Sequence, residues 1–436
     1  MLDWQKPVDQ CIETFREAGL ARAALIWDRR EQRLRCSHPM LDPLAAALAE
    51  DRDFDSHDGL FLEIGAESGH LMSATLHRTL RGQGAGGVRY WQYDDLDAFL
   101  HDGLRLSRGM GQKSALAGLW WGGGKGVIAR RADQDHRDPA VRSRVFRDYG
   151  RFMSGLRGCY VTAEDVGTRP EDMLHIHATT RFTTCVPEAL GGSGNPSEKT
   201  ARGVCMAMEA ALEHQGRGSL AGKRIAMQGL GNVATFMLTE LRERDVAGVI
   251  ATDVDPVRVK RVTEQFGAEW LRATAVDRRD NKILAEACDL LVPNAVGGIL
   301  NPETIPAIKA PIVCGAANNQ LEAPARDCRL LAENGVLFVP DFLANRMGIV
   351  NCANEQYGWF PGDPAIDKHL ERDSESGVFQ RTLEVLDRSE KAGTTPWEEA
   401  EKLADELAEQ AHPIWGDRTR DIIRYLFESG WAGGPS

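Results

Sequence analysis

The stretch KRIAMQGLGNVATFMLTELRER, residues 223–244, decides the fold that the sequence predicts. A short apolar run ends at Gln228, glycines follow at Gly229 and Gly231, and an amphipathic segment begins at Asn232. This order is typical of a buried strand, a tight turn and a helix. The stretch therefore predicts a strand-turn-helix unit of an α/β domain.

The residues on both sides of this unit extend the pattern. Short apolar runs recur with helix-length segments between them, at residues 249–253, 289–293, 311–315 and 336–340. Strands separated by helices indicate a parallel sheet that is covered on both faces. We therefore expect a doubly wound domain over residues 193–348, in which Ser197 caps a first helix that ends near His214.

The GLGNVA turn carries a candidate binding function. Gly229 makes the tight turn, and Gly231 lets the backbone approach a pyrophosphate at the helix N-terminus, where Asn232 and Val233 follow. Asp253 closes the next strand and is able to accept a ribose hydroxyl. A glycine turn that serves packing alone is the other interpretation, but the strand-turn-helix context favours a dinucleotide.

The choice of dinucleotide depends on charge. Asp253 favours NAD, because a carboxylate repels a 2'-phosphate. Arg258 and Lys260 follow closely in the sequence and leave NADP open.

The first half of the chain has a different organisation. Residues 60–65 and 70–77 are predicted to form two strands of a hairpin, and residues 94–108 and 141–157 are predicted to form amphipathic helices. The segment GGSGNPS, residues 191–197, is the clearest linker. Residues 1–58 are an extension without an assigned role, and residues 349–436 return to helical patterns.

Two lysines and one aspartate are the candidates for proton chemistry. The stretch GMGQKSALAGLWWGGGKGV, residues 109–127, contains Lys113 and Lys125, and Asp165 follows a short apolar run. An amine in an apolar surround has a lowered pKa and is able to take a proton near neutrality. The competing interpretation has solvated lysines, an ordinary glycine turn and an aspartate that caps a helix or forms a loop salt bridge.

Composition excludes several classes of protein. The 436 residues include 52 basic and 64 acidic ones, a net charge of -12, which argues against a nucleic acid partner. Nine scattered cysteines without a CxxC pair indicate reduced thiols rather than a metal site. A signal peptide and a long apolar window are not evident, so we expect a cytoplasmic protein without a membrane partner.

Several segments in the same order resemble one known family. They are GAGGVRYWQYDD (84–95), LRLSRGMGQKSALAGLWWGGGKGVI (104–128), RFMSGLRGCYVTAEDVGT (151–168), GGSGNPSEKTARGV (191–204), GLGNVA, NAVGGILNPETI (294–305), GAANNQL (315–321) and NCANEQYG (351–358). Together they resemble the glutamate/leucine/phenylalanine/valine dehydrogenase family of amino acid dehydrogenases, and the leucine type in particular.

The resemblance implies the reaction and its main residues. An L-amino acid is oxidatively deaminated to the 2-oxo acid and ammonia with reduction of NAD, and the reverse reaction aminates the 2-oxo acid. Lys113 would bind the substrate carboxylate, Lys125 would be the general base that activates water, and Asp165 would exchange protons with the amino group. The resemblance also implies that residues 59–192 form a substrate-binding and dimerisation domain, that residues 349–436 pack back on it, and that the protein is a homo-oligomer.

The resemblance assigns the remaining site residues by position. Thr200 and Asn319 correspond to positions near the nicotinamide and the substrate. The other substrate-site positions are Gly86, Gly87, Met110, Ala85, Ala163, Ile349 and Cys352.

The pocket positions predict an apolar substrate. Ala85 and Cys352 carry no charge, whereas the resemblance implies a lysine and a serine at these positions in glutamate-specific members. A substrate carboxylate without a partner would be costly to bury. Arg346 and Met347 depart from the family pattern, in which two small residues stand at these positions. Three interpretations of Arg346 are open: it points outward, it narrows the pocket, or it pairs with an acidic substrate. The alternative hypotheses are therefore an enzyme with a polar specificity and a catalytically silent relative that binds a nucleotide or a partner.

Overall fold

The computed structural model describes residues 3–433, which form two compact units. Unit 1 contains the described part of residues 1–194, 352–360 and 405–436, and unit 2 contains residues 195–351 and 361–404. The boundary after residue 194 lies within the expected linker. The expected C-terminal segment, residues 349–436, is divided between the units instead of packing as one piece on the first domain.

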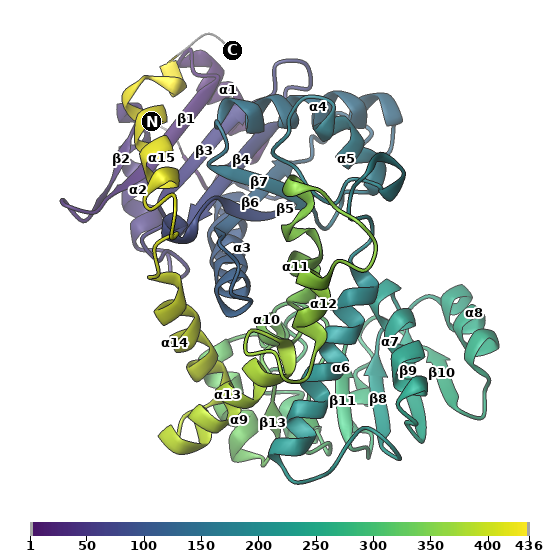
Figure 1. The fold of residues 1–436 in the computed structure, drawn as a ribbon. Helices are drawn as coiled ribbons and strands as arrows, with labels where there is room; N and C mark the ends of the chain where they lie inside the picture. Colours follow the sequence, from purple (N-terminus) through teal and green to yellow (C-terminus); the bar gives the residue numbers. More distant parts are fainter. Residues whose placement is uncertain (1–2, 434–436) are drawn as a thin grey trace. The chain divides into compact units, whose positions relative to one another are not determined.

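Unit 1 is built on a seven-stranded mixed sheet (Figure 1). Its strands are β1 (Arg22–Asp28), β2 (Arg33–Cys36), β3 (Gly59–Ile64), β4 (Leu71–His77), β5 (Gly84–Trp91), β6 (Gly122–Ala129) and β7 (Tyr160–Glu164). The order is β2-β1-β3-β4-β6-β5-β7. The neighbouring strands β2, β1, β3, β4 and β6 pair antiparallel, each with the next, and β5 lies parallel to both β6 and β7. The hairpin of β3 and β4 is as expected, while β1 and β2 show that the N-terminal extension is part of the sheet.

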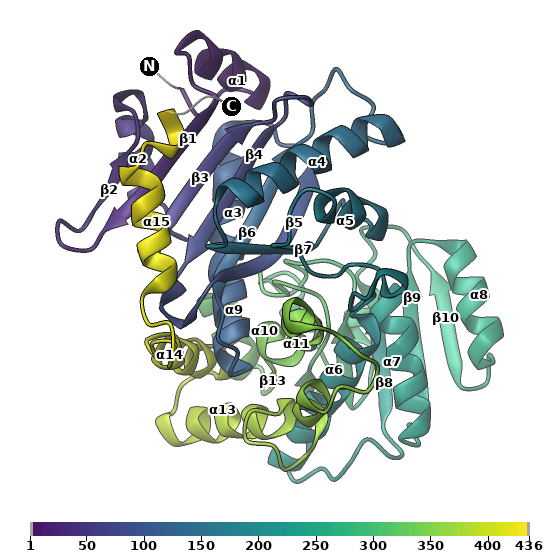
Figure 2. The same ribbon diagram turned by 45° about the horizontal axis from the view of Figure 1, so that its top comes forward.

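Helices cover both faces of this sheet. They are α1 (Val8–Glu17), α2 (Asp42–Ala49), α3 (Leu96–Leu116), α4 (Pro139–Gly155), α5 (Pro170–His177) and α15 (Arg418–Glu428). The first three pack on the face that carries Leu60 and Leu62, and α4, α5 and α15 pack on the face that carries Phe61 (Figure 2). Alternate strand residues thus bury two apolar cores, because successive side chains point to opposite faces.

Strand β6 contains the glycine-rich segment that one interpretation makes a turn. A Cβ on Gly123 would lie 2.1 Å from the Ser107 carbonyl oxygen of α3, and a Cβ on Gly124 would lie 2.5 Å from the Tyr160 ring of β7. The glycines therefore form a strand against which α3 packs backbone to backbone. Helix α3 also runs past the expected residue 108 and carries Lys113 in its last turn.

Unit 2 contains a parallel six-stranded sheet. Its strands are β8 (Arg224–Gln228), β9 (Gly248–Asp253), β10 (Leu271–Ala275), β11 (Leu290–Pro293), β12 (Ile312–Val313) and β13 (Leu337–Phe338). The order β10-β9-β8-β11-β12-β13 is that of a doubly wound dinucleotide-binding fold, as the sequence predicts. Strand β10 is not among the expected strands, because this edge strand buries only Leu271 and lacks an apolar run.

Helix α6 (Ser197–His214) begins where the sequence predicts, but its expected cap is wrong. Pro196 occupies the N-cap position, and the Asn195 side chain accepts a hydrogen bond from the Ser197 amide at 3.0 Å. Ser197 is thus the first helical residue. The other long helices of unit 2 are α7 (Asn232–Glu243), α8 (Pro256–Phe266), α9 (Pro324–Glu333) and α13 (Val378–Ala392).

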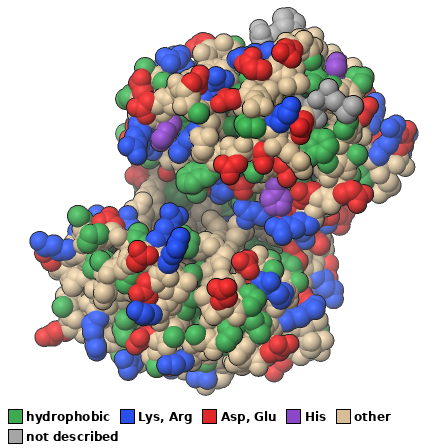
Figure 3. All heavy atoms as spheres, turned by 180° about the vertical axis from the view of Figure 1, so that it is seen from behind, with side chains coloured by type: hydrophobic (Ala, Val, Ile, Leu, Met, Phe, Trp, Pro, Cys, Tyr) green, Lys and Arg blue, Asp and Glu red, His purple; other side chains and the backbone are tan. Residues whose placement is uncertain are grey.

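The remaining α-helices are short except for α14, which has 13 residues. They are α10 (Asp341–Ala344), α11 (Met347–Ala353), α12 (Pro364–Asp367) and α14 (Pro396–Ala408). Acidic and basic side chains are interspersed over the face shown in Figure 3. Within residues 3–433, every helix is too short or too polar to cross a membrane.

We expect Gly123→Ala to lower the free energy of unfolding by about 1 to 3 kcal/mol, because its methyl group would collide with backbone atoms of α3. Gly109→Ala in the same helix is the matched control, since a Cβ there meets nothing within 4 Å. The control should raise stability by about 0.5 to 1 kcal/mol. Denaturant unfolding checks both values, and an unchanged Gly123→Ala variant would contradict the packing.

Candidate active site

Lys125 is held on the central strand β6 of unit 1. Its side chain is 3% exposed, and Nζ lies 2.9 Å from Oδ1 of Asp165. Because residues 122, 123, 124 and 126 are all glycine, Lys125 is the one residue of this segment with a side chain. The strand therefore presents a buried ammonium group to a single neighbouring carboxylate oxygen, and the solvated interpretation of this lysine is wrong.

Asp165 lies directly after β7 and is fixed by the main chain around it. Its amide donates to the Thr168 hydroxyl at 2.8 Å. Gly87 of β5 makes room for it, since a Cβ at Gly87 would lie 2.7 Å from the Asp165 Cβ. Asp165 is neither a helix cap nor a surface salt bridge.

Two further residues belong to this site, Arg89 and Asp102, and neither was predicted from the sequence. Arg89 Nε lies 3.2 Å from Oδ2 of Asp165, and its Nη1 lies 2.7 Å from Oδ2 of Asp102. Tyr93 donates its hydroxyl to Asp102 at 2.8 Å, and Arg105 binds the other oxygen of the same carboxylate. Alternating charges thus extend from the lysine to helix α3. Arg89 belongs to the GAGGVRYW segment, in which it is the one charged residue among small and apolar residues, and it is half-buried.

Burial and neighbouring charges set the protonation of the pair. Burial lowers the pKa of the Lys125 amine, Asp165 opposes this effect, and Arg89 adds to it. Burial alone would raise the pKa of the Asp165 carboxyl, but Lys125 and Arg89 outweigh it and lower the pKa to about 2. A carboxyl whose pKa falls on folding stabilises the folded state above about pH 4, and this contribution is lost as the pH falls toward 2.

The predicted substrate positions of unit 1 lie on strands β5 and β7 and on helix α3. Gly86 lies between β6 and α3, since a Cβ there would lie 1.9 Å from the Gly124 carbonyl oxygen and 3.0 Å from Met110 Cγ. Ala85 is buried on β5, and Ala163 is half-buried on β7 opposite Gly87. Lys113 is half-buried in the last turn of α3.

Two of the residues predicted to set the side-chain specificity, Ile349 and Cys352, are close in sequence. Cys352 lies in unit 1, and Ile349 lies in unit 2. Both are buried. The Cys352 thiol interacts with Cys185, and this contact together with burial raises the pKa of the Cys185 thiol. Glu355 holds the same segment in place by accepting the amides of Cys185 and Ser193 at 2.8 and 3.1 Å. Cys352 therefore has a fixed position next to a second thiol.

The glycine turn of unit 2 fits a dinucleotide pyrophosphate. Gly229 has a φ of +94°, and a Cβ there would lie 2.8 Å from the Ala295 Cβ. At Gly231 a Cβ would meet nothing within 4 Å, and no side chain caps the helix that begins at Asn232 and Val233. The first amides of α7 are thus available to an anion that approaches the open side of Gly231.

Asp253 makes more contacts than the sequence predicts. Its carboxylate accepts the Leu230 amide at 2.7 Å and binds Nη1 of Arg258 at 2.9 and 3.0 Å. Burial opposes ionisation of Asp253, but these amide and guanidinium contacts lower its pKa. Asp253 therefore holds the glycine turn and positions Arg258 at the same time.

Thr200 and Asn319 are both held by hydrogen bonds within unit 2. The Thr200 hydroxyl donates to the Pro196 carbonyl at 2.9 Å, next to Gly348, where a Cβ would lie 3.3 Å from Oγ1. Asn319 has a φ of +51°, and its amide donates to Asp341 at 2.8 Å. A left-handed asparagine is uncommon, and its cost is offset here by a defined carboxylate acceptor.

Arg346 does not point outward. Its side chain is among the largest fully buried ones of the described residues, and Nη2 donates to the Ser376 carbonyl at 2.5 Å. Burial, together with the charge of Arg381, lowers its pKa to about 9. Met347 is also fully buried and contacts the position of Gly203. Both departures from the family pattern are thus packed within unit 2.

Comparisons with known proteins agree with this arrangement. Residues 191–404 match the family described as Glutamate/Leucine/Phenylalanine/Valine dehydrogenase, and residues 72–182 match its dimerisation domain. The chain is 40% identical to leucine dehydrogenase from Bacillus subtilis over 79% of this chain and 89% of that protein. It is 35% identical to valine dehydrogenase from Streptomyces virginiae, over 82% and 96% of the two chains. The solved structure of L-tryptophan dehydrogenase from Nostoc punctiforme is similar with a TM-score of 0.65 and 31% identity, over 81% of this chain and 96% of that chain.

The doubly wound domain with its open glycine turn and the family match over most of the chain define an oxidoreductase that acts on CH-NH2 donors. The chain belongs to the glutamate/leucine/phenylalanine/valine dehydrogenase family, whose members use NAD(P) and form oligomers through the dimerisation domain. It is an amino acid dehydrogenase.

We expect Asp165→Asn to lower the free energy of unfolding by about 3 kcal/mol at pH 7, because it leaves the Lys125 ammonium buried without its counter-charge. The loss should shrink as the pH rises above 7, because burial lowers the pKa of Lys125 and the unpaired amine then releases its proton more readily. The double variant Asp165→Asn, Lys125→Met should lose less than the single variant. Chemical denaturation across this pH range checks both statements; a loss independent of pH would contradict the buried pair.

Proposed function

We propose that the protein catalyses the NAD-dependent oxidative deamination of an apolar L-amino acid to the 2-oxo acid and ammonia, and the reverse amination. The observation that carries the proposal is the Lys125 amine, buried at 3% exposure and 2.9 Å from Asp165. A lysine with a lowered pKa is suited to act as a general base.

The two lysines have different tasks in this proposal. Lys113, half-buried at the end of α3, binds the substrate carboxylate as an ammonium group. Lys125 takes a proton from the water that attacks the imino carbon of the oxidised substrate. Asp165 exchanges protons with the amino group, which leaves as ammonia. The strand and helix backbones hold these groups in fixed positions, so little reorganisation is needed during the reaction.

The neutral surroundings of the substrate positions support an apolar side chain. Gly86, Gly87, Met110 and Ala163 contribute no charge, and neither do Ala85, Ile349 and Cys352. Arg346 is bound to the main chain inside unit 2, which argues against its use as a partner for an acidic substrate. Relatives named for leucine, valine and tryptophan point in the same direction. We therefore favour a branched-chain or aromatic substrate over glutamate.

NAD is the proposed cofactor. Bound NAD would accept the hydride from the substrate Cα. Gly229, Gly231, Asn232 and Val233 would hold its pyrophosphate, and Thr200 and Asn319 would lie near its nicotinamide. Asp253 places a carboxylate at the end of β9, and its pair with Arg258 at 2.9 Å would have to open before Arg258 could bind a 2'-phosphate. This favours NAD over NADP. We also propose that the enzyme is a homo-oligomer.

The direct test follows NADH absorbance with purified protein and a panel of L-amino acids at mildly alkaline pH. Leucine, valine or phenylalanine should be oxidised in preference to glutamate, and NAD should be preferred to NADP. Lys125→Ala should lower kcat at least about a hundredfold, as expected for the loss of a general base. Reduction of neither cofactor with any amino acid would contradict the proposed function, and an unaffected Lys125→Ala variant would contradict the mechanism.

Arg89 should set the pH at which the enzyme becomes active. The Arg89 charge lowers the pKa of Lys125, so Arg89→Leu should move the alkaline rise of kcat/KM upward by about one pH unit. Arg105→Leu is the matched control, because Arg105 binds Asp102 without contacting Asp165. Equal pH profiles for Arg89→Leu and Arg105→Leu would argue against this role of Arg89.

A further inference from the structure

Unit 1 contains a cavity of about 380 Å³ that is separate from the residues described above. It lies between the β1-β2 hairpin and helix α15. Its lining residues are Ile26, Trp27, Asp28, Arg29, Arg30, Arg35, Asp58, Arg420, Ile423, Arg424 and Glu428. Five arginines and three carboxylates line the cavity, in a chain whose net charge is -12.

The cavity is built from segments outside the family regions. The matched regions cover residues 72–182 and 191–404, whereas every lining residue lies within residues 26–58 or 420–428. The fold therefore brings together two parts of the chain that lie outside the matched regions. The family relationship assigns nothing to this cavity.

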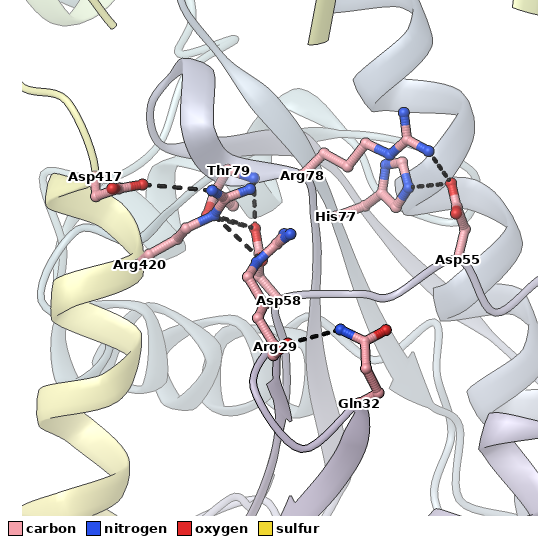
Figure 4. Close-up of polar contacts among 9 residues, drawn as sticks. All are labelled: Arg29, Gln32, Asp55, Asp58, His77, Arg78, Thr79, Asp417 and Arg420. Carbon is pink, nitrogen blue, oxygen red and sulfur yellow. Dashed lines mark hydrogen bonds and ion pairs between the residues drawn. The ribbon is translucent and has the colours of Figure 1, made fainter. Parts of the chain in front are cut away.

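A buried carboxylate organises the inner part of the cavity (Figure 4). Asp58 is 5% exposed in its side chain; its Oδ1 lies 2.8 Å from Arg29 Nη2 and 3.4 Å from Arg420 Nε. Its Oδ2 accepts the amide and the hydroxyl of Thr79 at 2.6 and 2.9 Å. The two guanidinium groups thus share the Asp58 carboxylate, and Arg420 Nη1 also lies 3.4 Å from Oδ1 of the exposed Asp417.

Three arginines, Arg30, Arg35 and Arg424, line the outer part of the cavity together with the carboxylates Asp28 and Glu428. Asp28 uses Oδ1 to accept the amides of Arg30 and Glu31, and its other oxygen lies 3.8 Å from Arg35. Arg424 lies 3.3 Å from Asp421 on the exposed surface of α15. An exposed ion pair of this kind opens readily when a stronger ligand binds the arginine, because surface ion pairs contribute little to the stability of the folded state.

The cavity also has an apolar wall. Ile26 and Ile423 are buried, and Trp27 is half-buried. A ligand that fills the cavity therefore needs an anionic group and an apolar or aromatic group. The volume falls within the range of small-molecule sites, about 300 to 1,000 Å³, and exceeds what a single inorganic anion needs.

We propose that this cavity, which we name the arginine pocket, binds a phosphate monoester that carries an aromatic or branched apolar group. Guanidinium groups bind phosphate oxygens through paired hydrogen bonds, and several arginines together match a dianion better than a monoanionic carboxylate. The apolar wall would cover the organic part. This inference does not depend on the proposed reaction.

Titration calorimetry with the full-length protein at low salt tests the proposal, with phenyl phosphate as the probe. Phenyl phosphate should bind saturably, about tenfold or more tightly than inorganic phosphate, and phenol should not bind measurably. Equal binding of phenyl phosphate and inorganic phosphate would reduce the pocket to a nonspecific anion site. Absence of binding by phenyl phosphate would overturn the proposal.

Charge-reversal variants locate the binding. Arg30→Glu combined with Arg424→Glu should weaken binding of phenyl phosphate at least about tenfold, because both arginines line the pocket and both are exposed. Arg137→Glu is the matched control, since Arg137 is an exposed arginine of unit 1 outside the pocket. The melting temperature and the amino acid dehydrogenase activity should not change in either variant. Unchanged binding in the double variant would place the ligand elsewhere and contradict the proposal.

Discussion

The burial of one lysine on a central strand is the constraint on which the rest of unit 1 depends. Lys125 is 3% exposed and has a carboxylate oxygen of Asp165 at 2.9 Å. An isolated buried ammonium group would be costly, so its surroundings must provide a fixed counter-charge. Two neighbouring features of the sheet serve this requirement. The glycines around Lys125 remove competing side chains, and Gly87 admits Asp165.

The same constraint explains why the site extends beyond the pair. Asp165 is shared between Lys125 and Arg89, and Arg89 is in turn balanced by Asp102 of helix α3. The chain of charges lets the lysine remain paired while Arg89 works against its protonation. Because α3 packs on β6 through Gly123, the position of Asp102 is fixed by backbone contact rather than by flexible side chains. Geometry and protonation are thus determined by the same packing.

Much of this arrangement was predictable from the sequence. The GLGNVA turn between a strand and a helix predicted the parallel sheet of unit 2, and the family segments singled out Lys125 and Asp165 as candidate site residues. Other features were not predictable, for physical reasons. The glycines of β6 resemble a turn because their role, close approach of α3, depends on residues distant in sequence. Strand β10 is nearly devoid of buried side chains, so no apolar run marks it. Arg346 is buried against a main-chain carbonyl of residue 376, a contact that no local pattern encodes.

The most direct test of the account measures the protonation of Lys125 itself. Trace labelling of amines with acetic anhydride over a pH series, followed by mass spectrometry of the Lys125 peptide, gives the pH at which this amine becomes half reactive. We expect this pH to lie below the pKa of an unperturbed lysine, which is about 10.4, since burial and Arg89 lower the pKa of Lys125. A value at or above 10.4 would contradict the central claim that the fold holds this amine ready to accept a proton.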